Sequence, residues 1–470
     1  MRIKTDLFPH QVPAVEKMMH TTIGALFMEM GTGKSRTTIE LVHRRLGRID
    51  KAIWFCPVSL KETVRQEILK HTDCTYEDIY VFGDKTTAKG LPRVLWYVIG
   101  IESTSSSMRV VLAINRLITS QTMVILDESS FIKGHTSMRT MRITELSKKA
   151  KYRLILTGTP ISQGVVDLYS QMRFLSPKIL GYNSFYSFAA NHLEYSDKFP
   201  DKIVRSHNTA YIAAKIKPYV YQITKEECLD LPKKLYETRY CYPTDEQAKY
   251  YDFAKDQILS ELEKENFDSS VIFRLFTALQ EIACGFWNRK VKGKFKLMEF
   301  KHDRLDTFMS VVRDIPDDKK IIVWAKFQYD IQGIIRRLTA EYGDESISVF
   351  HGGIPEKKRT YQVEKFRNQA KFFVSTPSCG GHGLTLNEAH YDIFYSNSFK
   401  YSERLQAEDR NHRIGQGHSV TYIDIQCSCG IDNRIASALI NKQNAADSFR
   451  EEVEKIKDNK GKLRELIKSL

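Results

Sequence analysis

The chain has 470 residues, enough for two or three domains that each bury a core of their own. Hydrophobic residues make up 42% and charged residues 27%, which is typical of a folded globular protein and argues against a disordered one. The 71 Lys and Arg residues exceed the 57 Asp and Glu residues by 14, and this excess favours a polyanionic partner such as nucleic acid. No signal peptide or apolar span is visible, so we expect no membrane contact. The expected location is the cytoplasm of a bacterial or phage-infected cell, or the nucleus in a eukaryote.

Short apolar runs recur along both halves of the chain. The runs expected to be strands are 24–28, 52–56, 94–99, 123–126 and 153–156 in the first half, and 321–325, 347–350, 372–374, 393–396 and 420–425 in the second. They are separated by helix-forming stretches, as is typical of parallel strands that are covered on both faces. The sequence therefore predicts an α/β protein with two doubly wound parallel-sheet lobes in tandem and helical insertions between them.

Four segments are expected along the chain. They are a first lobe at 1–228 with a helical insertion at about 165–221, a region at 229–300 with a hinge around 229–241 and a second insertion, a second lobe at 301–445, and a C-terminal brace helix at 446–470.

Residues 289–296 alternate charged and apolar side chains around Gly293, which predicts a hairpin with one basic face. Its candidate DNA contacts are Lys290, Lys292 and Lys294. Such a hairpin either contacts a DNA backbone, splits strands or is simply solvated, and the pattern does not choose between these roles.

Residues 28–36 follow the first predicted strand and open a helix, which is the setting of a phosphate-binding loop. Glycines in the loop let backbone N–H groups approach phosphates at the helix N-terminus. Lys34 is expected to reach the β- and γ-phosphates of ATP, and Ser35 to bind Mg²⁺. The residues expected to contact the nucleotide are Met30, Gly31, Thr32, Gly33, Lys34, Ser35 and Arg36.

Asp127 and Glu128 end the apolar strand at 123–126. Asp127 is placed to hold Mg²⁺, usually through water, and Glu128 to orient and deprotonate the attacking water. Paired acids at a strand end also cap helices, but their combination with a phosphate loop favours ATP hydrolysis.

Gln406, Arg410 and Arg413 lie far along the chain, in the second lobe. The two arginines are three residues apart, so on a helix they share one face and can point together at a γ-phosphate. Arginine suits this role because its planar, permanent charge stabilises the spread charge of the transition state.

In order and spacing, these motifs resemble the Swi/Snf-type branch of the superfamily 2 helicases over nearly the whole chain. The resemblance implies two RecA-like lobes that close over one ATP. It assigns Gln11 to reading the adenine base and Gly383 to the glycine-rich motif that couples the lobes. The segment 406–413 has the form found in fork-remodelling and strand-annealing members. Ser130 departs from the family pattern, because a coupling histidine is usual at that place.

The resemblance also implies contacts with the DNA backbone in both lobes. The implied residues are Pro57, Ser59, Leu60 and Thr157 in the first lobe, and Lys326, His351, Gly352 and Thr376 in the second.

The function that the resemblance implies is a DNA-dependent ATPase that tracks along double-stranded DNA with ATP and Mg²⁺. It would remodel branched DNA, by branch migration or fork reversal, in replication, recombination or repair. Two alternatives stay open, namely the motor subunit of a restriction or defence complex and a strand-separating helicase. A DNA-binding scaffold with a decayed ATPase is disfavoured, because Lys34, Asp127 and Glu128 are all present. We expect a monomer, and the sequence does not identify protein partners.

Overall fold

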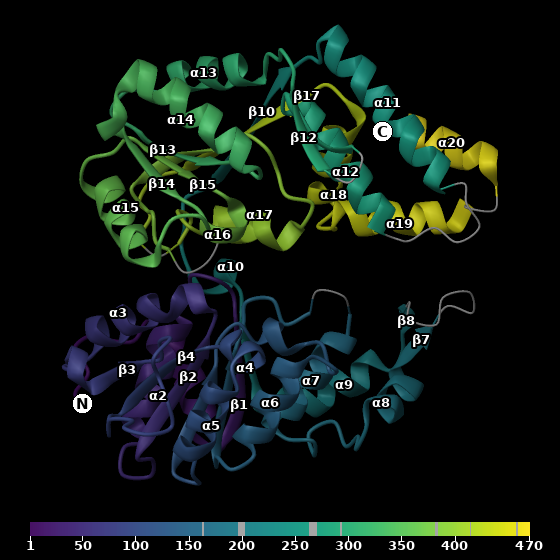
Figure 1. Ribbon diagram of the computed structural model, residues 1–470. Coiled ribbons are helices and arrows are strands. Elements are labelled where there is room, and N and C mark those ends of the chain that lie inside the picture. Colours follow the sequence, from purple (N-terminus) through teal and green to yellow (C-terminus); the bar gives the residue numbers. More distant parts are fainter. Residues whose placement is uncertain are drawn as a thin grey trace. The chain divides into compact units, whose positions relative to one another are not determined.

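The computed structural model describes residues 1–161, 164–195, 203–262, 270–291, 294–380, 384–413, 415–456 and 459–470 (Figure 1). The chain forms two compact units, Met1–Asp230 and Leu231–Leu470. Each unit has a parallel sheet and a buried core of its own. Among the described residues, no helix combines the length and the apolar character that a membrane span needs.

Unit 1 is built on a seven-stranded parallel sheet with the order β3-β4-β2-β5-β6-β1-β9. Its strands are β1 (Ile23–Met28), β2 (Lys51–Cys56), β3 (Ile79–Val81), β4 (Trp96–Gly100), β5 (Thr122–Leu126), β6 (Tyr152–Leu156) and β9 (Val220–Ile223). All five strands expected from the sequence are present. The two that the sequence did not indicate, β3 and β9, are short strands at the edges of the sheet.

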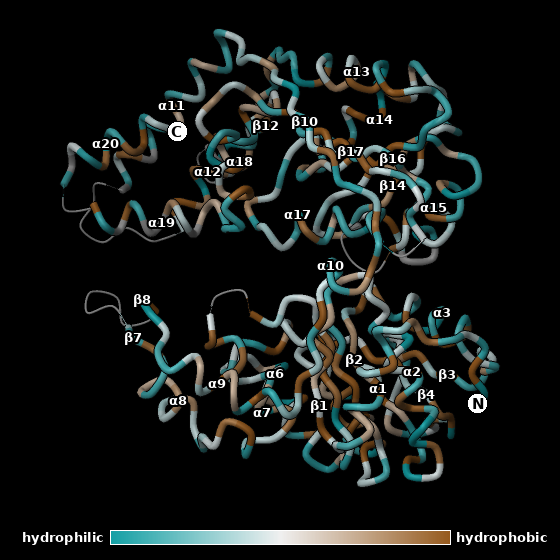
Figure 2. Tube along the Cα trace, turned by 180° about the vertical axis from the view of Figure 1, so that it is seen from behind, coloured by the Kyte–Doolittle hydropathy of each residue, from teal (hydrophilic) through white to brown (hydrophobic). Residues whose placement is uncertain are grey.

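Helices cover both faces of this sheet (Figure 1). One face is covered by α1 (Gln11–Met19), α2 (Lys34–Arg44) and α3 (Lys61–His71), and the other by α5 (Met108–Leu117), α6 (Met138–Ser147) and α7 (Val166–Leu175). The remaining helices of the unit are α4 (Ser103–Ser106), α8 (Phe185–His192), α9 (Thr209–Ile216) and α10 (Lys225–Cys228). Strand β1 sends Ala25 and Phe27 into one core cluster, and Leu26 and Met28 into the other. Burial on both faces explains why the strands are almost uninterruptedly apolar, as the brown segments of Figure 2 show.

Unit 2 has a six-stranded parallel sheet with the order β10-β17-β16-β13-β15-β14. Its strands are β10 (Lys234–Cys241), β13 (Lys320–Trp324), β14 (Ile347–Phe350), β15 (Phe372–Ser375), β16 (Ala389–Phe394) and β17 (Val420–Cys427). The five expected strands are again present. The hinge expected around 229–241 is wrong for most of its length, because residues 234–241 form the edge strand β10, paired along its whole length with β17.

The helices of unit 2 are α11 (Asp245–Leu262), α12 (Ser270–Ala283), α13 (Arg304–Asp314), α14 (Gln328–Tyr342), α15 (Glu356–Asn368), α16 (Pro377–Gly380), α17 (Tyr401–Glu408), α18 (Gly430–Ile440), α19 (Ala445–Ile456) and α20 (Lys460–Lys468). Helices α11, α12, α18, α19 and α20 share a second hydrophobic core beside the sheet (Figure 1). In it, the hydroxyl of Tyr251 donates to the carbonyl of Leu470 at 2.5 Å, which ties α11 to the last residue of the chain. Between α12 and α13, β11 (Phe286–Val291) and β12 (Lys294–Glu299) form an antiparallel hairpin where the sequence predicts one.

Candidate active site

The predicted phosphate loop connects β1 to α2. Gly31 and Gly33 have φ angles of 78° and 85°, a conformation that favours glycine. The Nζ atom of Lys34, the first residue of α2, donates to the carbonyls of Met28 at 2.9 Å and Glu29 at 3.2 Å. The ammonium group therefore lies inside the curve of the loop, where a nucleotide phosphate can replace these carbonyls as its partner.

Two side chains from the segment before the loop support it. The Nε2 atom of Gln11 donates to the carbonyls of Thr32 at 3.3 Å and Gly33 at 3.1 Å, and the ring of His10 hydrogen-bonds Thr32 at 2.7 Å. A Cβ atom on Gly33 would lie 2.0 Å from that Nε2 atom. Gln11 is fully buried, and its Oε1 atom accepts from Phe8 N. Both ends of the Gln11 amide are therefore used to shape the loop, and this arrangement differs from the expected contact with adenine.

The side chain of Arg36 is bound to other residues of unit 1, and its expected nucleotide contact stays a prediction. Its guanidinium group pairs with Glu40 at 3.0 Å and hydrogen-bonds the carbonyl of Thr5 at 2.6 Å, and the residue is buried. Arg36 is two residues beyond Lys34, so on a helix its side chain points about 200° around the axis from the lysine. It fixes α2 to the N-terminal segment instead.

Asp127 and Glu128 lie at the carboxyl end of β5, two strands from β1 in the sheet. The indole N–H of Trp54 donates to Asp127 Oδ2 at 3.3 Å, and the backbone N–H of Glu128 donates to Oδ1 at 3.0 Å. Burial, and then the charge of Glu128, raise the pKa of Asp127 to about 6, while Lys34 opposes the shift. Glu128 has a φ of 48°, an unusual conformation for a residue with a side chain. Such strain is found at functional sites.

The residues present fit a magnesium ion. Mg²⁺ is held in proteins by one or two carboxylates together with hydroxyl, water and phosphate oxygens. Asp127 offers a carboxylate whose charge a cation would stabilise against the cost of burial. Ser35, in the first turn of α2, offers a half-buried hydroxyl.

The segment after β6 contacts the phosphate loop. A Cβ atom on Gly158 would lie 3.1 Å from the backbone nitrogen of Met30, so any larger residue would crowd the phosphate loop. Gln171 on α7 connects the same segment to the acidic one. Its Nε2 atom donates to the carbonyl of Pro160 at 2.8 Å, and its Oε1 atom accepts from Ser129 at 2.6 Å.

The roles of Trp54 and Gln171 were not predicted from the sequence. A tryptophan in a strand and a glutamine in a helix are common, and only the order of the strands brings these two to the site. Gly158 lies in the segment 156–160, which the resemblance to the Swi/Snf-type helicases assigns to linking hydrolysis with lobe movement.

In unit 2 the arginine segment begins on helix α17. The expectation that Arg410 and Arg413 share a helix face is wrong, because α17 ends at Glu408 and both arginines lie in the turn that follows. The two side chains nevertheless converge. Arg410 Nη1 and Arg413 Nη1 donate to the carbonyl of Leu384 at 3.1 Å and 2.8 Å, and Arg410 Nε donates to the carbonyl of Gln406 at 2.8 Å.

The turn with these arginines is fixed to the sheet by buried hydrogen bonds. Asn411 donates to Asp392 Oδ1 at 2.6 Å, and the indole N–H of Trp324 donates to Oδ2 at 3.0 Å. Lys234 on β10 binds Glu408 at 2.9 Å. The position of the arginines is therefore set by three strands of the sheet. Gly383, expected to act in the neighbouring glycine-rich motif, lies outside the described residues.

The DNA contacts expected in unit 1 differ in their exposure. Ser59 is exposed in the 3₁₀ turn Val58–Leu60 at the carboxyl end of β2. Pro57, Leu60 and Thr157 are buried. Their side chains are not presented to a ligand in this structure, so any contact at these positions uses the backbone.

In unit 2, the side chain of Lys326 is bound inside the unit, and its expected DNA contact stays a prediction. Its Nζ atom donates to Gln280 at 2.8 Å and lies 3.1 Å from the centre of the Phe399 ring. Burial lowers the pKa of this lysine to about 7, so its charge is costly where it lies. The lysine turns inward at the end of β13 and joins α12 to the sheet.

The other expected DNA contacts of unit 2 are spread over its loops and the hairpin. Gly352 is exposed, His351 is half-buried and Thr376 is buried. Lys294 is exposed on β12, and Lys290 lies opposite Phe295 in the hairpin register. Lys292 lies outside the described residues.

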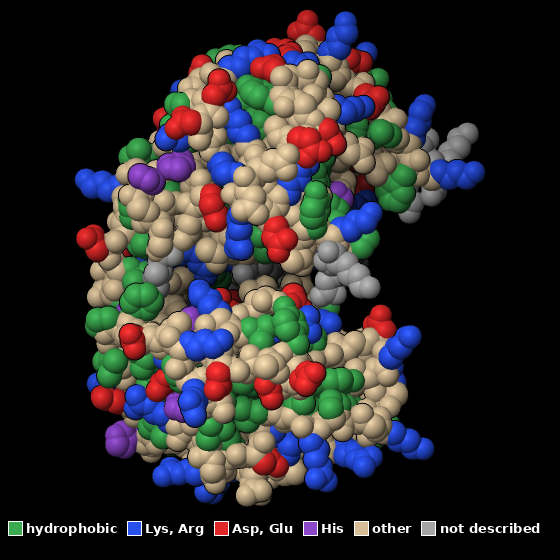
Figure 3. Space-filling view, turned by 90° about the vertical axis from the view of Figure 1, so that its left-hand side faces the viewer, with side chains coloured by type: hydrophobic (Ala, Val, Ile, Leu, Met, Phe, Trp, Pro, Cys, Tyr) green, Lys and Arg blue, Asp and Glu red, His purple; other side chains and the backbone are tan. Residues whose placement is uncertain are grey.

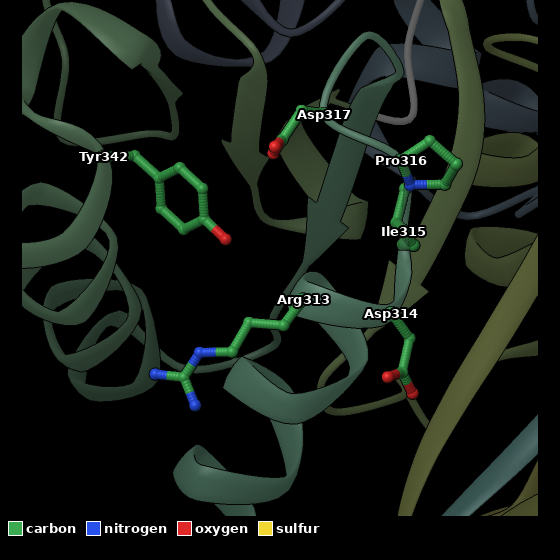
Figure 4. Close-up of a pocket in the computed structure, with 6 residues that line it drawn as sticks. All are labelled: Arg313, Asp314, Ile315, Pro316, Asp317 and Tyr342. Carbon is green, nitrogen blue, oxygen red and sulfur yellow. The ribbon is translucent and has the colours of Figure 1, made fainter.

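A separate hollow of about 380 Å³ lies at the end of α13 (Figure 4). Its lining residues are Arg313, Asp314, Ile315, Pro316, Asp317 and Tyr342. This segment precedes β13, so the hollow lies at the amino end of that strand. Ligands of doubly wound sheets bind at the carboxyl ends, and we assign this hollow no part in the site.

Comparison with known families decides the identity of the chain. Residues 10–285 match the SNF2-related domain, and residues 301–415 match the helicase conserved C-terminal domain. The first match covers more than half of the chain. The chain belongs to the SNF2-related family. It has the two parallel-sheet units that the resemblance to the Swi/Snf-type branch of helicase superfamily 2 implies.

Relatives of this SNF2-related chain occur in bacteria and eukaryotes. An uncharacterized ATP-dependent helicase of Mycoplasma genitalium is 27% identical over 332 residues, which are 68% of this chain and 30% of the relative. The TATA-binding protein-associated factor mot1 of Aspergillus fumigatus is 25% identical, over 94% of this chain and 27% of its own length. The chain therefore spans less than a third of the length of these relatives. The Sulfolobus solfataricus SWI2/SNF2 ATPase core in complex with dsDNA is 23% identical with a TM-score of 0.45, covering 99% of this chain and 97% of that one.

Proposed function

We propose that this chain is a DNA-dependent ATPase that uses ATP hydrolysis to move along double-stranded DNA. One observation carries the proposal, namely that a phosphate loop after β1 and the pair Asp127–Glu128 after β5, two strands away, lie at the same carboxyl edge of the unit 1 sheet. In a member of the SNF2-related family, this arrangement is the ATP-hydrolysing half of a motor.

The side chains of unit 1 have distinct roles in this proposal. Lys34 leaves the loop carbonyls and binds the β- and γ-phosphates of ATP. Ser35 and Asp127 hold Mg²⁺, which when bound neutralises phosphate charge. Glu128 orients the attacking water and accepts its proton. Arg410 and Arg413 of unit 2 stabilise the charge on the transferred phosphoryl group.

Hydrolysis is communicated to the rest of unit 1 through Gly158 and Gln171. Gly158 packs against the phosphate loop, and Gln171 connects Ser129, beside Glu128, to the segment that contains Gly158. A change at the γ-phosphate that shifts either segment therefore shifts the other.

Duplex DNA as the track is supported by charge and by the family. The chain has a formal charge of +14, and Lys and Arg side chains are spread over both units, interspersed with acidic ones, on the face shown in Figure 3. Scattered cations suit contacts with a phosphate backbone that do not depend on sequence, as a motor needs. The form of the segment 406–413 supports branched DNA, remodelled by branch migration or fork reversal, as the preferred substrate.

The test is ATP hydrolysis by the wild type and Glu128→Gln, each without nucleic acid and with single strands, duplex, forks and four-way junctions. We expect strong stimulation by duplex or junctions and a loss of about 10²- to 10⁴-fold in the variant, because a general base is removed. Nucleotide affinity should change little. Hydrolysis that is indifferent to DNA would contradict the proposal, and stimulation by plain duplex equal to that by junctions would remove the branched-DNA part alone.

A further inference from the structure

The hairpin β11–β12 is firmly attached at its root. The ring of Phe286 lies 4.3 Å from that of Tyr329 and 5.4 Å from that of Phe327, in the segment that directly follows β13. The Tyr329 hydroxyl donates to Glu299 at 2.9 Å, and Glu281 of α12 accepts from the backbone of Asn288 at 3.0 Å. The root therefore lies at the carboxyl end of β13, on the edge of the sheet where ligands of such folds bind.

The outer part of the hairpin exposes two apolar side chains on one face. Phe295 is 69% and Leu297 is 50% exposed, and they are two residues apart on β12, so they point the same way. Single exposed apolar residues are normal. An exposed aromatic ring beside an exposed leucine, near the end of a fixed hairpin, is a surface suited to a flat apolar ligand.

The opposite face of the hairpin is cationic. Lys294 and Lys296 are exposed there, and Arg289 lies opposite Lys296 in the register. The Arg289 guanidinium is held 4.7 Å from the Phe253 ring and 5.1 Å from the Trp287 ring. No acidic residue occurs between residues 289 and 298. The charge of this face therefore complements a polyanion, and nucleic acid combines such a charge with flat bases that suit the exposed ring of the other face.

We propose that the outer hairpin binds an unpaired base of single-stranded DNA where it leaves a duplex, with Phe295 stacked on the base and Leu297 packed beside it, while Lys294 and Lys296 of the opposite face attract the phosphates of the adjoining duplex. This inference rests on the proposed function, whose substrate it narrows to DNA with a duplex–single-strand junction. An unpaired base is required because bases inside a duplex are stacked on their neighbours and do not offer a face.

The test is the ratio of the affinities for a forked and a blunt duplex, measured by fluorescence anisotropy at one salt concentration for the full chain. Phe295→Ala should lower the preference for the fork by about 5- to 100-fold, the effect of losing one stacked base. Phe295→Trp should restore it. The matched control is Tyr186→Ala, which removes an aromatic ring that is 83% exposed on α8 and should leave the ratio unchanged.

A fluorescent adenine analogue at the junction gives a second measurement, because stacking on Phe295 should quench it in the wild type and Phe295→Trp but not in Phe295→Ala. Equal ratios in wild type and Phe295→Ala, or no fork preference in the wild type, would overturn the inference. A change in the sedimentation coefficient of Phe295→Ala, with an unchanged ratio of fork and duplex affinities, would also overturn it. That result would show that Phe295 contacts another copy of the chain.

Duplex-stimulated ATP hydrolysis by the wild type is measured in parallel. If it is absent, the proposed function fails, and if it is present with equal ratios, only the hairpin inference fails.

Discussion

The two units contain the same pair of side chains, a tryptophan that donates its indole N–H to an aspartate on a neighbouring strand. In unit 1, Trp54 binds Asp127 at 3.3 Å, and in unit 2, Trp324 binds Asp392 at 3.0 Å. Asp127 lies just beyond the end of β5 and is half-buried, whereas Asp392 lies within β16 and is fully buried, with its second oxygen bound by Asn411.

The difference shows how one local arrangement serves two purposes. Burial raises the pKa of both carboxyl groups, of Asp127 to about 6 and of Asp392 to about 8. The carboxyl group of Asp127 stays within reach of a ligand, and we propose that it binds Mg²⁺. That of Asp392 is enclosed by side-chain donors and instead fixes the turn that presents Arg410 and Arg413.

The largest effect is expected from Arg413→Lys. If unit 2 acts on the phosphates through this turn, lysine will not reproduce the planar, multidentate contact, and the turnover of ATP should fall by about 10³-fold or more. Steady-state hydrolysis with saturating DNA measures this, with ATP affinity from a fluorescent analogue as the control. A loss below tenfold would mean that unit 2 is only a scaffold.

Asp127→Asn tests the unit 1 side of the comparison. Turnover should fall at least about 100-fold, because a carboxylate ligand of Mg²⁺ is removed. The unliganded protein should become more stable at pH 7 to 8, because above pH 6 the buried carboxylate of the wild type is ionised at a cost. Thermal unfolding without nucleotide checks this. A lower unfolding midpoint in the variant would contradict the stated cost of keeping the buried carboxylate ionised.

The same substitution in unit 2, Asp392→Asn, should lower the stability of the protein, whereas Asp127→Asn should raise it. The amide of asparagine carries two N–H hydrogens where the protonated carboxyl group has one O–H, so it cannot accept from both Trp324 and Asn411, and the free energy of unfolding should fall by about 1–3 kcal/mol. Urea unfolding measures it, with Asp127→Asn as the matched control. Equal effects of the two substitutions would remove the distinction between the pairs.

The last prediction concerns the dependence of stability on pH. The pKa of Asp392 is about 8 in the folded protein and about 4 in an unfolded chain, so the folded state retains a proton that the unfolded state has lost in between. Stability from this group is therefore complete below pH 4 and is lost as the pH rises toward 8, at up to about 1.4 kcal/mol per pH unit. Melting curves between pH 5 and 8 should show a steeper decline for the wild type than for Asp392→Asn, and parallel declines would contradict the shift.

The buried strands could be predicted from the sequence because their apolar runs have no polar interruption. Strand β10 could not, since its residues are mostly exposed and read as a linker. An edge strand is hydrogen-bonded on one side only and needs no apolar pattern. The hairpin was predictable because a glycine between alternating residues is a local signal.

Within the site, the sequence located the phosphate loop and the acidic pair because their chemistry is local. It did not show the direction of the Arg36 side chain, which depends on the helix phase, or that of Lys326, which turns inward to Gln280. It also missed Gln171 and both tryptophans. These residues reach the site only because of the order of the strands in each sheet, and that order cannot be read from the sequence.

The central claim is that hydrolysis by this chain drives movement along duplex DNA, and displacement of a triplex-forming strand from a duplex tests it most directly. The account predicts that the wild type with ATP and Mg²⁺ releases the third strand at a rate that exceeds spontaneous release, and that Glu128→Gln or a non-hydrolysable ATP analogue abolishes the gain. DNA-stimulated hydrolysis without any displacement would contradict the claim and show an ATPase that binds DNA without moving on it.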